Sequence, residues 1–390
     1  GYFVNTTAGA ISVNLPAGTA GAVVGFKDYT NTFDSNAVTL VQNGSDKIGG
    51  SAVNAVLSTE GLAVTLVFVD STQGWLVTDN GTQDTAPTAE YVTATGGTPT
   101  TSPCGNYKIH TFTGPGTLCV SNAGNPSGST TVDYLVVAGG GGANGGPGNT
   151  AGGAGGGGFR ASSSTYSIGA APASPLITSV SALPVSVQGY TITVGGGGAG
   201  NTNCGGNNGN PSTFSSITST YGAKPNFNGG SGGGTPGGAL NVPGGTGNTP
   251  PVSPPQGNDG GASSNPSGPD HASGGGGGAG AAGTQGRASS PTQSGPGGIG
   301  AGLPNAFGTS GESSGGFYYF SAGGGAGGNG GIPVTAGTGG IGGGGDGGSN
   351  AGCAGSTNTG GGGGAGGGPA GGSGGSGGSG IVVIRYKFQN

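Results

Sequence analysis

Glycine constrains this sequence more than any other residue type, and it is concentrated in one part of the chain. Of the 390 residues 106 are Gly, and 88 of these glycines lie beyond position 135. Fixing a glycine backbone costs more conformational entropy than fixing any other residue. A folded tract of this composition must therefore be stabilised by its main chain. The glycine runs occupy residues 139–142, 152–158, 195–200, 229–238, 274–283, 323–331, 337–348, 360–368 and 371–380.

Composition alone would make the tract a disordered low-complexity segment, but the runs are discrete and apolar strands bracket them. They lack the Gly-X-Y period of collagen. A bundle of polyglycine II helices satisfies the backbone instead, because an extended helix with three residues per turn points its N–H and C=O groups sideways at neighbouring helices. We expect Ala, Ser and Asn to fall on the outer helices or at helix ends, since a Cβ inside the bundle would push a neighbour away.

The first 80 residues show short β-branched and aromatic runs about ten residues apart, without helical periodicity. This spacing predicts an antiparallel sandwich or barrel of six or seven strands. The lone Trp75 is expected in its core, with a sugar-stacking site as the alternative. The chain has no initiator Met and opens in an apolar run, which indicates a processed product or a distal piece of a longer protein. The predicted strands lie at 2–4, 11–15, 23–26, 38–41, 62–69 and 74–77.

A second β region follows, with strands predicted at 107–112, 116–120 and 132–137. The Gly-Pro-Gly sequence at 114–116 predicts a hairpin between the first two. That hairpin would place Cys104 and Cys119 close enough for a disulfide, and Cys204 with Cys353 is a second candidate pair. His110 is expected to be a surface residue of its strand.

The predicted fold class is all-β, with essentially no α-helix. The strands at 135–137 and 381–386 enter and leave the glycine tract, so their pairing would make the tract a closed insertion in a β domain. We expect an N-terminal β-sandwich or barrel at 1–80, a linker at 81–100, framing strands at 101–138, the polyglycine II bundle with its loops at 139–380, and a closing strand at 381–390.

Charge is scarce, which argues against several classes of function. Only 5% of the residues are charged, and the eight basic side chains are scattered, so no footprint for nucleic acid exists. No apolar stretch is long enough to span a bilayer. The cysteines have no metal-ligand spacing, and we expect neither a metal nor a cofactor. An enzyme such as a polysaccharide depolymerase is disfavoured, because the second part of the chain holds few acids: Asp133, Asp259, Asp270, Glu312 and Asp346.

Recognition would fall to the loops between glycine runs, because a rigid scaffold presents them. The run of aromatic residues at 317–320 is one candidate, with packing against the bundle as a hydrophobic cover as the alternative. The segment 221–228 is a second candidate, and His271 a third. The candidate receptor-binding residues are Phe317, Tyr318, Tyr319, Phe320, Tyr221, Asn226, Phe227 and His271.

Four segments together resemble the glycine-rich domain of tailed-phage fibre and virion proteins, of the kind found in cyanophages. They are 132–142 (VDYLVVAGGGG), 155–160 (GGGGFR), 190–198 (YTITVGGGG) and 377–386 (GGSGIVVIRY). The opening segments 1–6 and 24–29 also look like a module of such proteins. The tip adhesins of T-even-like phages are similar in using stacked polyglycine II helices, and some receptor-kinase ectodomains carry a comparable domain.

The resemblance implies an extracellular protein of the virion, a tail-fibre or tail-tip adhesin that contacts the host cell surface through loops of a rigid scaffold. Its expected partners are a host surface glycan or an outer-membrane protein, together with other tail or fibre subunits. A homotrimer is compatible with this role, although no heptad fixes the copy number. The alternative function is a purely structural virion fibre or extracellular filament subunit without receptor binding.

Overall fold

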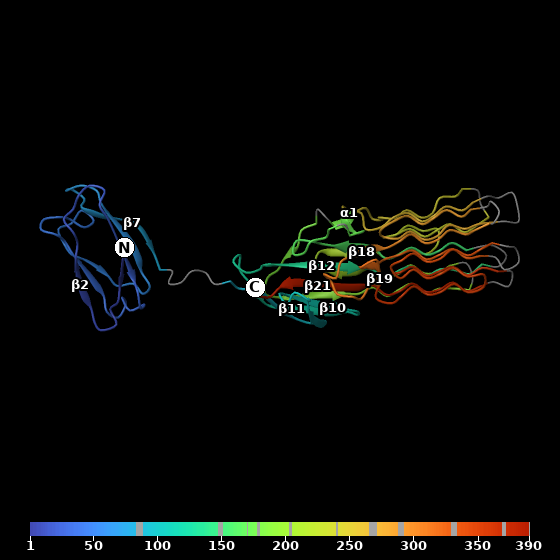
Figure 1. Cartoon of the computed structure of the whole chain (residues 1–390), viewed down its shortest axis with the longest axis horizontal. Coiled ribbons are helices and arrows are strands. Elements are labelled where there is room, and N and C mark those ends of the chain that lie inside the picture. The colour runs from blue at the N-terminus through green and yellow to red at the C-terminus, as the bar shows by residue number, and fades with distance from the viewer. Residues whose placement is uncertain are drawn as a thin grey trace. The chain divides into compact units, whose positions relative to one another are not determined.

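A computed structural model describes residues 1–82, 89–146, 151–169, 171–177, 180–202, 205–238, 241–264, 271–287, 292–328, 334–368 and 372–389. The chain divides into two compact units, Gly1–Thr88 and Ala89–Asn390. Strands dominate both units, and the one described helix, α1 (Ser174–Ile177), has four residues. The all-β prediction is confirmed (Figure 1).

The N-terminal unit is a sandwich of two sheets, with strand orders β1-β3-β6-β7 and β2-β4-β5. The pairs β1/β3 and β2/β4 are parallel, so the expectation of a wholly antiparallel module is wrong there. Alternate residues of the central strands face inward, and Trp75 is 1% exposed in the shared core, which confirms its core position. The strands are β1 (Tyr2–Val4), β2 (Ile11–Asn14), β3 (Val23–Asp28), β4 (Val38–Val41), β5 (Ala55–Leu57), β6 (Ala63–Phe68) and β7 (Trp75–Gly81).

The second unit begins with a β framework of two larger sheets and one small one. The sheet orders are β13-β12-β21-β10-β9, with β14 also paired to β12, then β17-β16-β15-β11-β8 and β18-β20-β19. Its strands are β8 (Val92–Thr95), β9 (Thr98–Thr101), β10 (Tyr107–Phe112), β11 (Gly116–Ala123), β12 (Thr131–Val137), β13 (Phe159–Ala161), β14 (Leu183–Pro184), β15 (Gly189–Thr193), β16 (Ser212–Phe214), β17 (Ile217–Ser219), β18 (Ala301–Leu303), β19 (Glu312–Ser314), β20 (Phe317–Phe320) and β21 (Ile381–Lys387).

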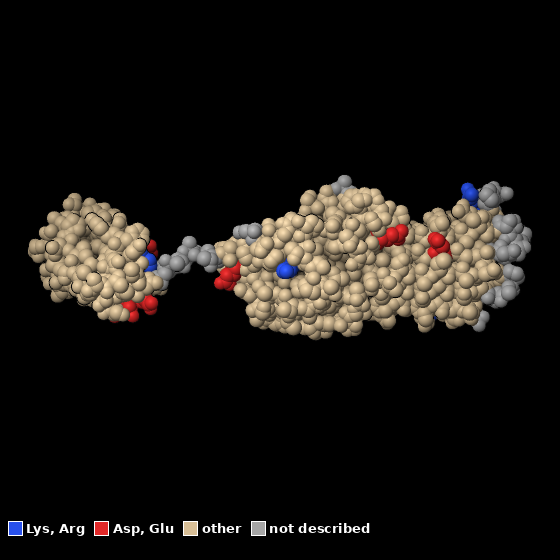
Figure 2. Space-filling model, turned by 60° about the horizontal axis from the view of Figure 1, so that its bottom comes forward, with Lys and Arg blue, Asp and Glu red and all other residues tan. Residues whose placement is uncertain are grey.

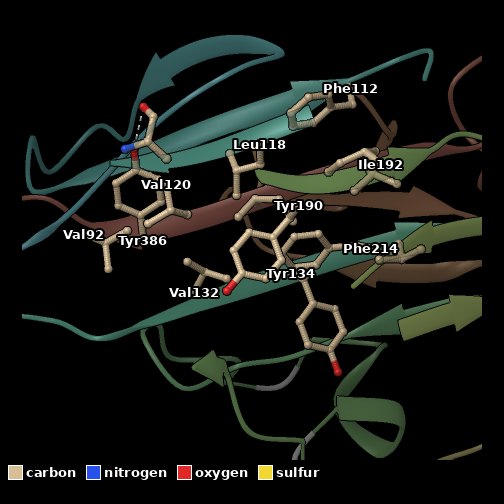
Figure 3. Close-up of a cluster of buried hydrophobic side chains, with 14 residues drawn as sticks. Val92, Phe112, Leu118, Val120, Val132, Tyr134, Tyr190, Ile192, Phe214 and Tyr386 are labelled. Carbon is tan, nitrogen blue, oxygen red and sulfur yellow. Dashed lines mark hydrogen bonds between the residues drawn. The ribbon is translucent and has the colours of Figure 1, made fainter. Parts of the chain in front are cut away.

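Strands β12 and β21 form the centre of this framework, and they pair antiparallel from Asp133↔Arg385 to Val137↔Ile381. The predicted pairing of the entering and leaving strands is thus confirmed, and the glycine tract is a closed insertion. Both faces of the pair are buried. One face packs between the two larger sheets, in the cluster that contains Tyr134, Phe214 and Tyr386 (Figure 3). The other face packs against Phe159, Phe307 and Phe320.

Three predictions for the segment before the tract are wrong. Strands β10 and β11 do not form a hairpin, because β10 pairs with β9 and β21 while β11 pairs with β8 and β15. Cys104 lies in the connection between β9 and β10 and Cys119 lies in β11 of another sheet, and both are free thiols. The predicted linker 81–100 contains β8 and β9, since the sequence Val-Thr-Ala-Thr at 92–95 alternates buried and exposed side chains.

His110 is also buried, against expectation. Its Nδ1 lies 2.6 Å from the carbonyl oxygen of Gly96 and its Nε2 lies 3.0 Å from the hydroxyl of Tyr386. A carbonyl only accepts, so Nδ1 carries the proton and Nε2 accepts from Tyr386. Burial, with a smaller contribution from the charge of Lys108, lowers the pKa of His110.

Because the folded state favours neutral His110, stability from this residue is present above the unfolded pKa of about 6.5 and is lost as the pH falls from there through the lower pKa of the folded state. We expect the free energy of unfolding to fall less steeply between about pH 7.5 and pH 5.5 in His110→Gln than in the wild type. Urea denaturation of both proteins across this range measures the difference. Parallel curves would show that His110 does not contribute.

The glycine tract extends from the β framework as a bundle of straight extended segments, here called rods (Figure 1). In the rod 138–146, residues three apart donate to the same neighbouring rod, which is the threefold repeat of a polyglycine II helix. Burial in the rod 194–202 has the same period, because Gly195 and Gly198 are buried and Gly196 and Ala199 are exposed. The donor pairs of the first rod are Gly139 to Asn210 (3.0 Å), Gly142 to Asn207 (2.8 Å), Gly140 to Gly378 (3.0 Å), Ala143 to Gly375 (2.9 Å) and Gly141 to Gly155 (2.9 Å).

The carbonyl groups of this rod accept from three further rods. The N–H groups of Gly222, Gly198 and Gly363 donate to the oxygens of residues 139, 140 and 141 at 2.8, 2.9 and 2.9 Å. Six described rods therefore surround the rod 138–146, and the turn 139–141 exchanges hydrogen bonds with all of them. Buried main-chain groups are satisfied without side chains. The predicted polyglycine II bundle is confirmed.

Alanines are not confined to the outside of the bundle, as we had expected. Ala143, Ala151, Ala154 and Ala365 are buried inside it and form one cluster. Since these methyl groups contact one another, several rods share a single gap that accommodates them. Interior positions therefore tolerate Ala where it occurs in such a group.

Candidate functional site

The bundle offers few side chains with chemistry, as the sparse charges on the face in Figure 2 illustrate. Lys224 is one of the basic residues within the tract. It begins a sharp turn that interrupts the rods between residues 220 and 229. The Phe227 N–H donates to the Lys224 carbonyl oxygen at 3.2 Å. Asn226 has a φ of 65°.

The local sequence explains this turn. Pro225 has the fixed φ favoured at the second position of a β-turn, and Asn is among the few residues that readily adopt positive φ at the third. The turn is anchored to the next rod, because the Asn226 N–H donates to Gly234 O at 3.1 Å and the Gly233 N–H donates to Phe227 O at 3.0 Å. The side chains at 224–227 are therefore held by a rigid backbone.

A pocket of about 300 Å³ lies beside this turn and is here called the turn pocket. The Phe227 side chain is 51% exposed, and the Lys224 Nζ lies 4.3 Å from the centroid of its ring. Glycines close the pocket from the adjoining rods without filling it. Its lining residues are Asn144, Gly205, Gly206, Lys224, Pro225, Asn226 and Phe227.

Two polar groups of the turn pocket lack a hydrogen-bond or carboxylate partner among the residues that the structure describes. The Asn144 Oδ1 is buried and accepts no hydrogen bond. Within the same described ranges, no carboxylate pairs with the Lys224 ammonium. A buried acceptor without a donor is costly. A ligand hydroxyl at Asn144 and a ligand anion at Lys224 would satisfy both groups, while Phe227 offers an apolar ring face.

The structure brings together only part of the predicted receptor-binding set. Asn226 and Phe227 line the turn pocket, whereas Tyr221 is half-buried and does not line it. His271 is half-exposed and does not line the pocket. Lys224 and Asn144 were not predicted; the Lys-Pro-Asn-Phe turn signature could have identified the first, but no sequence signal marks Asn144.

The aromatic run 317–320 has a different place, because it forms β20 of the small sheet. Phe320 is buried in the core beside β12 and β21, and Tyr318 packs against that core. Phe317 and Tyr319 are half-buried. For Phe320 and Tyr318 the structure thus fits the alternative interpretation, a hydrophobic cover.

Four acids of the second unit, Asp133, Asp259, Glu312 and Asp346, accept hydrogen bonds from backbone N–H groups. Glu312 Oε2 accepts from Gly342 and Gly343 at 2.7 and 2.8 Å. Asp259 and Asp346 each accept from one glycine N–H at 2.7 Å. These carboxylates hold turns between rods together, and Asp133 has a similar role in the β framework. Asp270 lies outside the described residues.

No metal-binding cluster of three or more His, Cys, Asp or Glu side chains occurs within the described ranges. Cys353 is an exposed thiol, and its predicted partner Cys204 lies outside those ranges. Among the same residues, no helix has the length and apolar character needed to cross a membrane.

An all-β framework with an inserted bundle of glycine rods defines the class of glycine-rich scaffold proteins. Residues 113–387 match the glycine-rich domain family, and the chain belongs to this family. No curated protein matches it. The family match covers β11 to β21 and thus includes the whole bundle and the turn pocket.

Proposed function

We propose that this protein is a receptor-binding component of a phage tail fibre or tail tip, and that the turn pocket contacts a glycan of the host surface. The resemblance to tailed-phage fibre proteins supports the biological setting. The exposed Phe227 ring, held beside the Lys224 ammonium on a rigid backbone, is the observation that carries the proposal.

Saccharide binding fits the chemistry of the turn pocket. The C–H face of a pyranose packs on an aromatic ring, and its hydroxyls donate to an acceptor such as Asn144 Oδ1. Lys224 adds a preference for sugars with a carboxylate, such as uronic acids. Because the turn is already fixed by hydrogen bonds to Gly233 and Gly234, binding would not require ordering of the loop.

The proposal is tested by binding of the full chain to an array of bacterial capsular and lipopolysaccharide glycans. We expect binding to acidic glycans, weakened at least about tenfold by Phe227→Ala, equivalent to 1.4 kcal/mol. Lys224→Gln should reduce the preference for acidic over neutral glycans.

Val187→Ala is the matched control, because Val187 is an exposed apolar residue of the same unit away from the turn pocket. It should bind like the wild type. A wild-type chain that binds no glycan on the array would contradict the proposal and favour the purely structural fibre subunit. Unchanged binding by Phe227→Ala and Lys224→Gln would exclude the turn pocket as the contact.

A further inference from the structure

The N-terminal unit has a hollow on the outer face of the sheet β1-β3-β6-β7, here called the cup. Its volume is about 440 Å³. Strand register places Phe3, Lys27, Ala63 and Gly81 in one row across the four strands, and Gly25, Thr65 and Asp79 in the next row. Small residues at 25, 63 and 81 form the floor of the cup, and larger side chains form its rim.

Gly25 has no structural reason to be glycine. It lies inside the central strand β3, where glycine weakens a sheet and frequently marks the close approach of a ligand. Its φ is not positive, and an added Cβ would come no closer than 3.7 Å to the Val64 carbonyl oxygen and 3.8 Å to Thr65 Oγ1. These are ordinary contact distances. The missing side chain therefore creates space rather than relieving a clash.

The rim of the cup combines an apolar ring with polar groups. Phe3 is 76% exposed and makes an edge contact with Tyr29, with ring centroids 6.5 Å apart. Across the floor lie the Thr65 hydroxyl and the Asp79 carboxylate, in the row of Gly25. The Lys27 ammonium is turned to the Gly61 carbonyl oxygen, at 2.5 Å. The Asp79 carboxylate disfavours an anionic ligand.

We propose that the cup is a second binding site, separate from the turn pocket, and that it takes a neutral saccharide. The Phe3 ring would pack on the C–H face of one pyranose, and Asp79 with the Thr65 hydroxyl would bind adjacent hydroxyls. Gly25 and Ala63 admit the sugar close to the sheet. The two sites thus differ in ligand charge, neutral at the cup and acidic at the turn pocket.

Ligand-observed NMR of the full chain tests the cup with five probes: the methyl glycosides of glucose, galactose and mannose, N-acetylglucosamine, and glucuronate. We expect saturation transfer to at least one neutral probe. Gly25→Val should weaken that binding at least about tenfold while leaving the melting temperature of this unit equal or higher, because valine favours strands. Asp79→Asn should weaken binding without filling the cup.

Two control variants distinguish a failure of the cup proposal from a failure of the turn-pocket proposal. Val23→Ala changes an exposed residue of the same strand outside the cup lining, and should bind normally. Phe227→Ala removes the turn pocket and should leave neutral-sugar binding intact, so the cup and the proposed function fail independently. The inference is overturned if no neutral probe shows transfer, or if both Gly25→Val and Asp79→Asn bind like the wild type.

Discussion

Gly141→Ala is expected to destabilise the second unit by about 3 kcal/mol, because its methyl group has no room. Gly141 lies in the rod that six others surround. A Cβ there would come 2.2 Å from the carbonyl oxygen of Ala223 and 2.5 Å from its carbon. Both are main-chain atoms held by their own hydrogen bonds, so a rod would have to move. Differential scanning calorimetry should show this unit melting about 6–12 °C lower.

Gly196→Ala is the matched control within the same bundle. Gly196 is exposed, and its added Cβ would meet only the Asn210 amide nitrogen, at 3.7 Å. We expect a neutral or slightly stabilising effect, up to about 0.5 kcal/mol, because alanine restricts the unfolded chain. The fluorescence of Trp75, the one tryptophan, reports the N-terminal unit and should be unchanged in both variants. Equal melting temperatures for the two variants would refute close rod packing.

Asp133→Asn is expected to lower the free energy of unfolding of the second unit by about 3 kcal/mol. Asp133 is fully buried and accepts hydrogen bonds from the Ser164 and Thr165 N–H groups at 3.0 and 2.8 Å, and from the hydroxyls of Ser162 and Thr165. An asparagine replaces one acceptor oxygen with an NH₂ group that faces these donors. The substitution therefore keeps the volume and breaks the network.

The charge of Asp133 is also balanced across the sheet. Arg385 lies opposite it in the β12–β21 register, stacks 3.6 Å from the Tyr107 ring centroid and donates to the Thr165 carbonyl oxygen at 3.0 Å. Burial lowers the pKa of Arg385, and Asp133 partly offsets this effect. Glu90→Gln, a change at an exposed acid of the same unit, should stay within about 0.5 kcal/mol. Urea denaturation compares the two variants, and equal midpoints would contradict the structural role of Asp133.

The sequence was sufficient to predict the polyglycine II bundle, because no other regular structure accommodates such glycine runs between apolar strands. It also predicted the pairing of the strands at 135–137 and 381–386. It could not predict which rods are neighbours, since rods recognise one another through identical main-chain groups. The Gly-Pro-Gly turn at 114–116 suggested a local hairpin, but long-range pairing of β10 with β21 prevailed.

The candidate site was only partly predictable, because rod packing brings together residues that are distant in the sequence. Phe227 and Asn226 stood out as an aromatic and a turn residue within a glycine-rich segment. Asn144 is distant in sequence and reaches the turn pocket only through rod packing. The aromatic run at 317–320 was the more conspicuous signal, yet one face of the β12–β21 pair needed an apolar cover, and β18 and β20 supply part of it.

The central claim is that main-chain hydrogen bonds between rods hold the second unit together and fix the turn pocket. Hydrogen–deuterium exchange measured by mass spectrometry tests this claim most directly, on peptides that contain the rods 138–146, 194–202 and 360–368. Since most amides of the rods 138–146 and 360–368 donate to neighbouring rods, we predict that these two rods exchange as slowly as β12 and β21, and that the partly exposed rod 194–202 exchanges faster. Exchange of the rod amides at the rate of an unfolded glycine chain, with β12 and β21 still protected, would contradict it.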